Sequence, residues 1–199
     1  GQGIVRNEKN IEISAESGVG IFVRDNGTGS GVGENTSTGT ISLENKESVG
    51  IFAKNNGTND TAKNSGTINL GKADGSTSHE SLIGMFAQAE SGKTASVKNT
   101  GTIDVNTKKS VGMYAKNDAT NVGDVDLQNT ETINVNNTGS AGIYANESNA
   151  TNESTGTITS KKGSSAGIYA TAKTAKDIKN EGIIEVGLTT APSETQGVG

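Results

Sequence analysis

The side chains of this chain that could catalyse a reaction are carboxylates. Asp124 and Asp126 form the only close Asp pair, and strand alternation would place them on one outward face with Asp104 nearby. Carboxyl groups about 5 to 10 Å apart can act as acid, base or nucleophile on a glycosidic bond. No cluster of Arg or Lys and no calcium-loop spacing accompanies these acids. We therefore expect solvated acids, no catalytic residue and no enzyme; a polysaccharide-active domain is the alternative.

Metal and cofactor chemistry finds no support in the sequence. The chain has no Cys and one His, His79, for which no partner acid is evident. Without Cys there is no thiolate nucleophile, disulfide or Cys-based metal site. The Gly-rich stretches carry neither a phosphate-loop Lys nor a dinucleotide fingerprint. We expect no metal site and no cofactor.

The charge and hydropathy of the chain exclude two classes of partner. The net charge is −5 and the pI is near 5.0. Binding to nucleic acid or to an anionic membrane calls for clustered Lys and Arg, which the sequence lacks. No apolar run approaches the roughly 20 residues of a membrane span. We expect no nucleic-acid partner and no direct membrane insertion of this segment.

All aromatic side chains, three Phe and three Tyr, occupy one position of a repeated motif. The motif reads small or aliphatic residue, Gly, Ile or Met, Phe or Tyr, and Ala or Val. Period-2 alternation predicts that Val19, Ile21 and Val23 face inward and that the ring of Phe22 faces outward. The rings then form either a stabilising stack or a stripe that binds a protein or a sugar ring. If they point inward instead, they are plain core. The candidate binding stripe is Phe22, Phe52, Phe86, Tyr114, Tyr144 and Tyr169.

A second motif places Asn or Ser four residues before an Ile. Its parity matches that of the Ile, so we expect an inward ladder of stacked side chains at a turn. The predicted ladder is Asn7, Ser37, Asn64, Asn99, Asn129, Ser154 and Asn180. The residue six before the Ile is apolar in five units but Asn35 and Asn152 in the other two, which predicts an irregular third wall.

These motifs require a stack of equivalent units. Successive motif Ile residues lie 25 to 35 residues apart, and the alternation within each motif is that of strands. We predict an all-β, right-handed parallel β-helix of about seven coils, each of roughly 25 to 35 residues. Residues 1–199 form one segment with insertions at 71–82 and 187–197. Because the chain begins and ends in mid-repeat, we interpret it as a fragment of a longer protein.

The succession of Lys98–Val105 and Ser110–Ala115 resembles the passenger repeats of large Gram-negative autotransporter adhesins of the type V route. The likeness is greatest to the fusobacterial type, although the motif is generic to the repeat class and no family binding residue can be placed here. The resemblance implies a β-helical passenger exported through the outer membrane to the bacterial cell surface. It also implies attachment to host cells or other bacteria through a protein or glycan receptor. An inert stalk spacer is the alternative.

Overall fold

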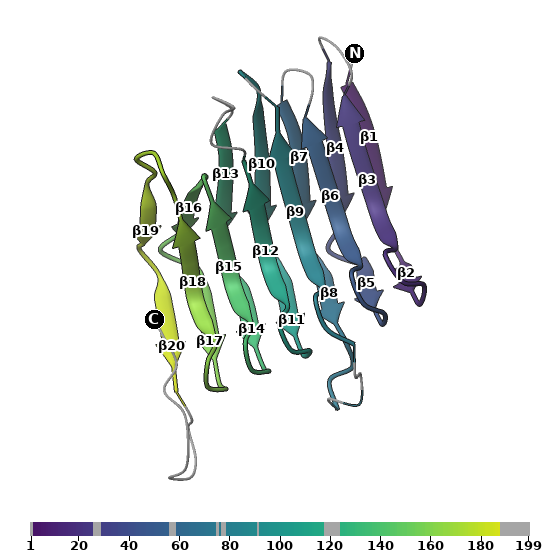
Figure 1. The fold of residues 1–199 in the computed structure, drawn as a ribbon. Helices are drawn as coiled ribbons and strands as arrows, with labels where there is room; N and C mark the ends of the chain where they lie inside the picture. Colours follow the sequence, from purple (N-terminus) through teal and green to yellow (C-terminus); the bar gives the residue numbers. More distant parts are fainter. Residues whose placement is uncertain are drawn as a thin grey trace.

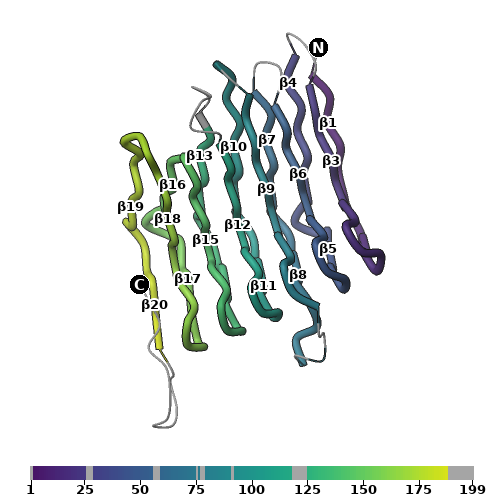
Figure 2. The backbone as a smooth tube through the Cα atoms, in the orientation of Figure 1, coloured from purple at the N-terminus to yellow at the C-terminus, as the bar shows by residue number. Residues whose placement is uncertain are grey.

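The computed structural model describes residues 2–25, 29–55, 59–74, 76, 79–90, 92–117 and 124–187. In these residues the chain forms strands and turns and no helix. Each of the first six coils contributes one strand to each of three sheets, and the described part of the seventh contributes to two of them, so strands about 30 residues apart in sequence lie side by side (Figure 1). The backbone trace shows the coils stacked in sequence order from one end of the rod to the other (Figure 2).

Sheets A and B contain seven strands each. Sheet A consists of β1 (Gln2–Asn7), β4 (Ser30–Asn35), β7 (Asn59–Asn64), β10 (Thr94–Asn99), β13 (Asp124–Asn129), β16 (Asn149–Asn152) and β19 (Ile178–Asn180). Sheet B consists of β2 (Asn10–Ile13), β5 (Thr40–Leu43), β8 (Thr67–Leu70), β11 (Thr102–Val105), β14 (Thr132–Val135), β17 (Thr157–Ser160) and β20 (Ile183–Val186).

Sheet C contains six strands, in which the aromatic motifs lie. They are β3 (Val19–Asp25), β6 (Val49–Asn55), β9 (Ile83–Ala89), β12 (Val111–Lys116), β15 (Ala141–Asn146) and β18 (Ala166–Thr171). All neighbouring strands pair in parallel, and like residues lie over like, as in Ile103 over Ile68 and Tyr114 over Phe86. The predicted all-β parallel β-helix is confirmed.

The core is a narrow apolar column between the three sheets. Ile41, Ile68, Ile103 and Ile133 of sheet B are fully buried, and Met85 and Met113 face them from sheet C. The outward neighbours of these Ile residues are Thr, Asn, Asp and Ser. This alternation is expected of strands that have one face in water. Because each coil adds only a few apolar side chains, burial depends on the coils above and below.

The alternation breaks at the Gly of each aromatic motif. Val19 is 43% exposed and Ile21 is 2% exposed, so the prediction that these two residues share a face is wrong. A Cβ on Gly112 would lie 2.7 Å from the carbonyl oxygen of Gly142 and 3.1 Å from the Ile133 side chain. Gly and the following residue therefore both face the interior, and the residue before Gly faces solvent.

The first predicted insertion lies between sheets B and C. Residues 71–82 connect β8 to β9, and Leu82, at the end of this segment, is fully buried. The second predicted insertion, residues 187–197, lies outside the described residues beyond Gly187.

Candidate functional site

Seven Asn side chains form a continuous ladder at the corner between sheets A and B. The amide nitrogen of each Asn donates to the amide oxygen of the Asn in the next coil, 2.8 Å away at every step. The same nitrogens donate to corner carbonyls, as Asn99 does to Gly101 at 3.0 Å. The ladder is Asn7, Asn35, Asn64, Asn99, Asn129, Asn152 and Asn180.

The placement of Ser37 and Ser154 in this ladder is wrong. The second and sixth coils each have two extra residues between the ladder Asn and the Ile. These residues form an exposed turn, closed by bonds such as that from the Gly39 amide to the Thr36 carbonyl at 2.9 Å. Asn35 and Asn152 are fully buried in the ladder. The third wall is therefore regular, with Gly33 and Ala150 in register with its apolar residues.

A serine ladder, which we did not predict, lines the corner between sheets B and C. The backbone amide of Ser110 donates to the Ser140 hydroxyl at 3.2 Å, and that of Ser140 donates to the Ser165 hydroxyl at 3.4 Å. Each hydroxyl donates to a corner carbonyl, such as that of Thr107, 2.9 Å from Ser140 Oγ. The sequence contains one signal for this ladder, because a Ser stands directly before four of the six aromatic motifs.

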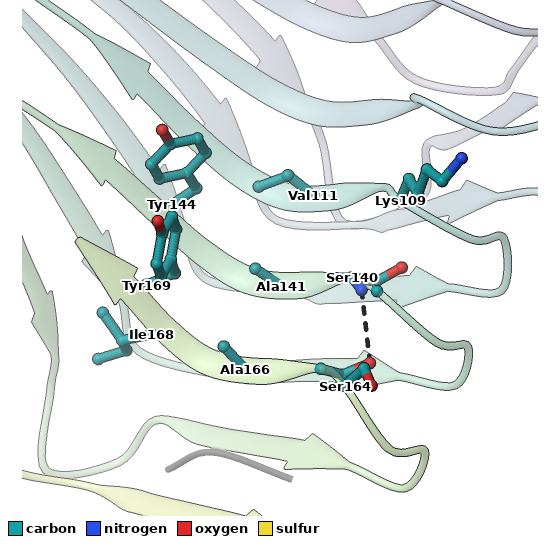
Figure 3. Close-up of a pocket in the computed structure, with 11 residues that line it drawn as sticks. Lys109, Val111, Ser140, Ala141, Tyr144, Ser164, Ala166, Ile168 and Tyr169 are labelled. Atoms are coloured by element: carbon teal, nitrogen blue, oxygen red, sulfur yellow. Dashed lines mark hydrogen bonds between the residues drawn. The ribbon is translucent and has the colours of Figure 1, made fainter. Parts of the chain in front are cut away.

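The residue before this ladder adopts a left-handed conformation in every coil. Lys109 has φ 51°, Ser164 has φ 58° and Gly139 has φ 67°. Non-glycine residues rarely adopt this conformation. It lies where the chain turns from sheet B to sheet C. Lys109 and Ser164 consequently stand at the border of the outer face of sheet C (Figure 3).

The aromatic stripe lies on that outer face, as its parity predicts. Adjacent ring centroids are 4.6 to 5.2 Å apart. In the middle of the stripe the ring planes are nearly parallel, with 10° between Phe86 and Tyr114. Each ring therefore covers the faces of its neighbours. The last pair, Tyr144 and Tyr169, is tilted by 48°, and Tyr169 is 51% exposed. The first pair, Phe22 and Phe52, is tilted by 56°, and Phe22 is 50% exposed, so ring surface is open at both ends of the stripe.

Burial within the stack affects the ionisation of one phenol. Desolvation raises the pKa of Tyr114 above its ordinary value of 10.0, against a hydrogen bond to Asn146 that lowers it. The hydroxyl therefore remains protonated at neutral pH and can donate as well as accept a hydrogen bond.

A groove of about 530 Å³ runs beside Tyr144 and Tyr169. Val111, Ala141 and Ala166 form its floor, in a row across β12, β15 and β18 (Figure 3). Lys109, Gly139 and Ser164 form the opposite rim. Small-molecule sites commonly enclose about 300 to 1,000 Å³ with apolar walls and a few polar groups. The groove and the adjoining end of the stripe are the candidate binding site.

The acids that strand alternation placed near one another lie in two different sheets. Asp126 lies in sheet A and accepts from Gln128 at 2.8 Å, whereas Asp104 lies in sheet B and accepts from Asn134 at 2.8 Å. The two side chains lie on the outer faces of different sheets, so the expected proximity of Asp104 and Asp126 is wrong. The side chain of Asp124 lies outside the described residues.

Among the described residues, no group of three or more His, Cys, Asp or Glu could hold a metal ion. No helix there has the length and hydropathy needed to cross a bilayer.

Comparison with known proteins gives one match. Residues 2–92 match the family model described as the BigA third pectate lyase-like domain. This range covers β1 to β9, under half of the chain, and stops before the groove. No curated protein and no solved structure gives a significant match. The match agrees with the β-helical fold and suggests a β-helix domain of a bacterial surface protein; the fusobacterial type stays a prediction.

Proposed function

We propose that this chain is a non-enzymatic segment of a bacterial surface adhesin. In this proposal the β-helix is part of an autotransporter passenger that is exported across the outer membrane. It acts outside the cell, where it holds a contact surface away from the membrane. Its partner is a protein or glycan receptor on host cells or other bacteria. No cofactor takes part.

The observation that carries this proposal is the outward aromatic stripe. The chain contains three Phe and three Tyr and no other aromatic residue, and none of these six side chains belongs to the buried core. Phe22 and Tyr169 at the two ends are about half exposed, at 50% and 51%. Exposed aromatic surface is enriched at protein interaction sites because it provides a large contact area at low entropic cost.

The regular rod supports a mechanical role. Coil upon coil repeats the same ladders, and the described residues show no cleft with converging carboxylates. The similarity to a pectate lyase-like domain concerns residues 2–92. The competing proposals are a polysaccharide-active β-helix and an inert spacer.

Attachment of coated beads tests the adhesive role. Beads that carry the chain should retain epithelial or bacterial cells under flow, and the Tyr114→Ala, Tyr144→Ala double variant should retain several-fold fewer. The Tyr114→Phe, Tyr144→Phe variant preserves the stack and controls for folding. Lys98→Ala, an exposed change on sheet A, should have no effect. Equal retention by wild type, the double Ala variant and uncoated beads would establish an inert spacer.

Enzymatic activity has its own assay. The chain is incubated with surface polysaccharides, and new reducing ends and unsaturated products are measured. The proposal expects neither. Release of either product that is lost in Asp126→Asn would replace the adhesin proposal with an enzyme.

A further inference from the structure

The groove arises from a local change in residue size along two columns. The residue before the motif Gly is Val or Ile in the first four coils but Ala141 and Ala166 in the last two. The second column consists of the residues with positive φ at the turn from sheet B to sheet C. In it Gly139 has no side chain, whereas the preceding coil has Lys109. Removing these side chains exposes the floor next to Tyr144 and Tyr169.

The stripe also changes in polarity along the rod. The aromatic residue is Phe in the first three coils and Tyr in the last three, so both rings that line the groove, Tyr144 and Tyr169, carry a hydroxyl group. The exposed Ser164 adds a hydroxyl on the opposite rim. The result is an apolar floor and ring surface bordered by hydroxyl groups. A pyranose ring has the complementary pattern, with C–H groups on its faces and hydroxyls at its edge.

The outer face of sheet C is positively charged although the chain as a whole is negative. Its outward positions carry Lys116 of β12 and, in the two strands farthest from the groove, Arg24 and Lys54, with no carboxylate at outward positions of the described strands. The turns that border the groove in the fourth and sixth coils expose Lys108, Lys109, Lys161 and Lys162 and contain no acid. Glu80 pairs with Lys109 at 3.1 Å, but the two side chains are 46% and 67% exposed. Such a pair is weak and can yield to a ligand carboxylate.

We propose that the groove between the tilted Tyr144 and Tyr169 rings and the Lys109 rim binds an anionic saccharide. The sugar ring lies against Tyr144, Tyr169 and the Ala floor, and its carboxylate or sulfate lies toward the lysines. This inference rests on the proposed function and narrows its receptor to acidic glycans. The charge distinguishes this occupant from a neutral sugar, and the flat ring contacts distinguish it from an acidic peptide.

Titration with a hyaluronan tetrasaccharide and its methyl ester tests the proposal. The two ligands share one shape, and only the acid carries charge. We expect calorimetry or NMR titration to show binding of the acid and binding of the ester weakened about tenfold, with affinity for the acid falling as salt rises. Lys109→Gln with Lys162→Gln should reproduce the loss. Lys46→Gln, in a turn of the second coil, should not.

The shape of the groove is tested by refilling it. Ala141→Val with Ala166→Val restores the residue of the second and fourth coils, so the variant should fold normally and bind at least about tenfold more weakly. Tyr144→Ala should weaken binding by a similar factor. Lys98→Ala, an exposed change on sheet A away from the groove, should leave binding unchanged.

Several outcomes would overturn the saccharide site. These are equal binding of acid and ester, unaltered binding by the refilled variant, or equally tight binding of hexaglutamate that survives Tyr144→Ala. If Tyr-dependent cell retention persists while the tetrasaccharide does not bind, this inference fails and the adhesin proposal stands. If the tetrasaccharide binds but coated beads retain no cells, the adhesin proposal fails and the saccharide site stands.

Discussion

At the scale of single residues, the Asn ladder satisfies polar groups that the narrow interior would otherwise leave unpaired. Asn129 accepts from Asn99 and donates to Asn152, each at 2.8 Å, and also donates to the Glu131 carbonyl at 2.8 Å. A buried group that loses its partner costs about 1 to 3 kcal/mol. Each Asn inside the ladder therefore provides hydrogen-bond partners for several neighbouring polar groups.

We predict that Asn129→Val lowers the free energy of unfolding by about 3 kcal/mol, because it leaves partners above, below and in the turn unpaired. Chemical denaturation followed by circular dichroism measures this change. Ser37→Val should change stability by less than about 0.5 kcal/mol, since Ser37 lies in an exposed turn. A large loss for Ser37→Val with none for Asn129→Val would contradict the register described here.

Most of the Asn ladder could be predicted from the sequence. Inward parity and the recurrence of Asn were enough to predict a buried amide column, and five of its members are in place. Counting back a fixed four residues from Ile failed at Asn35 and Asn152, because a turn can lengthen by two residues without disturbing either strand. Parity is unchanged by an even insertion, so the pattern alone could not locate it.

At the scale of elements, an ion-pair column links three strands of sheet A. Glu34 of β4 accepts from Arg6 of β1 at 2.9 Å and from Lys63 of β7 at 3.0 Å. The hydrogen bond from Arg6, and then that from Lys63, hold the pKa of the Glu34 carboxyl below its ordinary value of 4.5. Neighbouring coils are thus joined by side chains as well as by backbone bonds.

This depressed pKa predicts a pH-dependent stability. Above pH 4.5 the carboxylate is ionised in both folded and unfolded chains, and its contribution is fully present. As the pH falls through the lower folded pKa, the folded chain must take up the proton and the contribution disappears. Glu34→Gln should therefore be less stable than wild type at pH 7 and nearly equal at pH 2. Thermal melts at both values measure this difference, and a pH-independent gap would refute the role of the carboxylate.

The elements show a second limit of sequence reasoning. Period-2 alternation correctly placed the aromatic rings outside and Ile21 inside, but it failed two residues earlier, at Val19. The physical reason is the Gly between them, whose missing Cβ lets two successive residues face the core. Applied to the fifth and sixth coils, the same alternation places Ala141 and Ala166 in the interior, whereas they form the outer floor of the groove.

At the scale of the whole molecule, the strands run across the rod and the bonds between coils run along it (Figure 1). Tension applied to the chain ends therefore removes coils from the ends one at a time, since the bonds of a coil are loaded in succession. A coil of about 30 residues would release roughly 100 Å of chain. Optical-tweezer traces should show a series of small, low-force extensions of this size. One abrupt release of the entire length would contradict sequential removal.

The one-way direction of the Asn ladder has a consequence for recovery after a coil is pulled from the end of the rod. Every ladder amide donates toward the C-terminal side, so each newly exposed Asn still presents the group that its lost neighbour bound. A pull on the chain end would then release a loop while the remaining coils stay intact. When the force is removed, the exposed Asn is a template on which the released coil folds back in its original register.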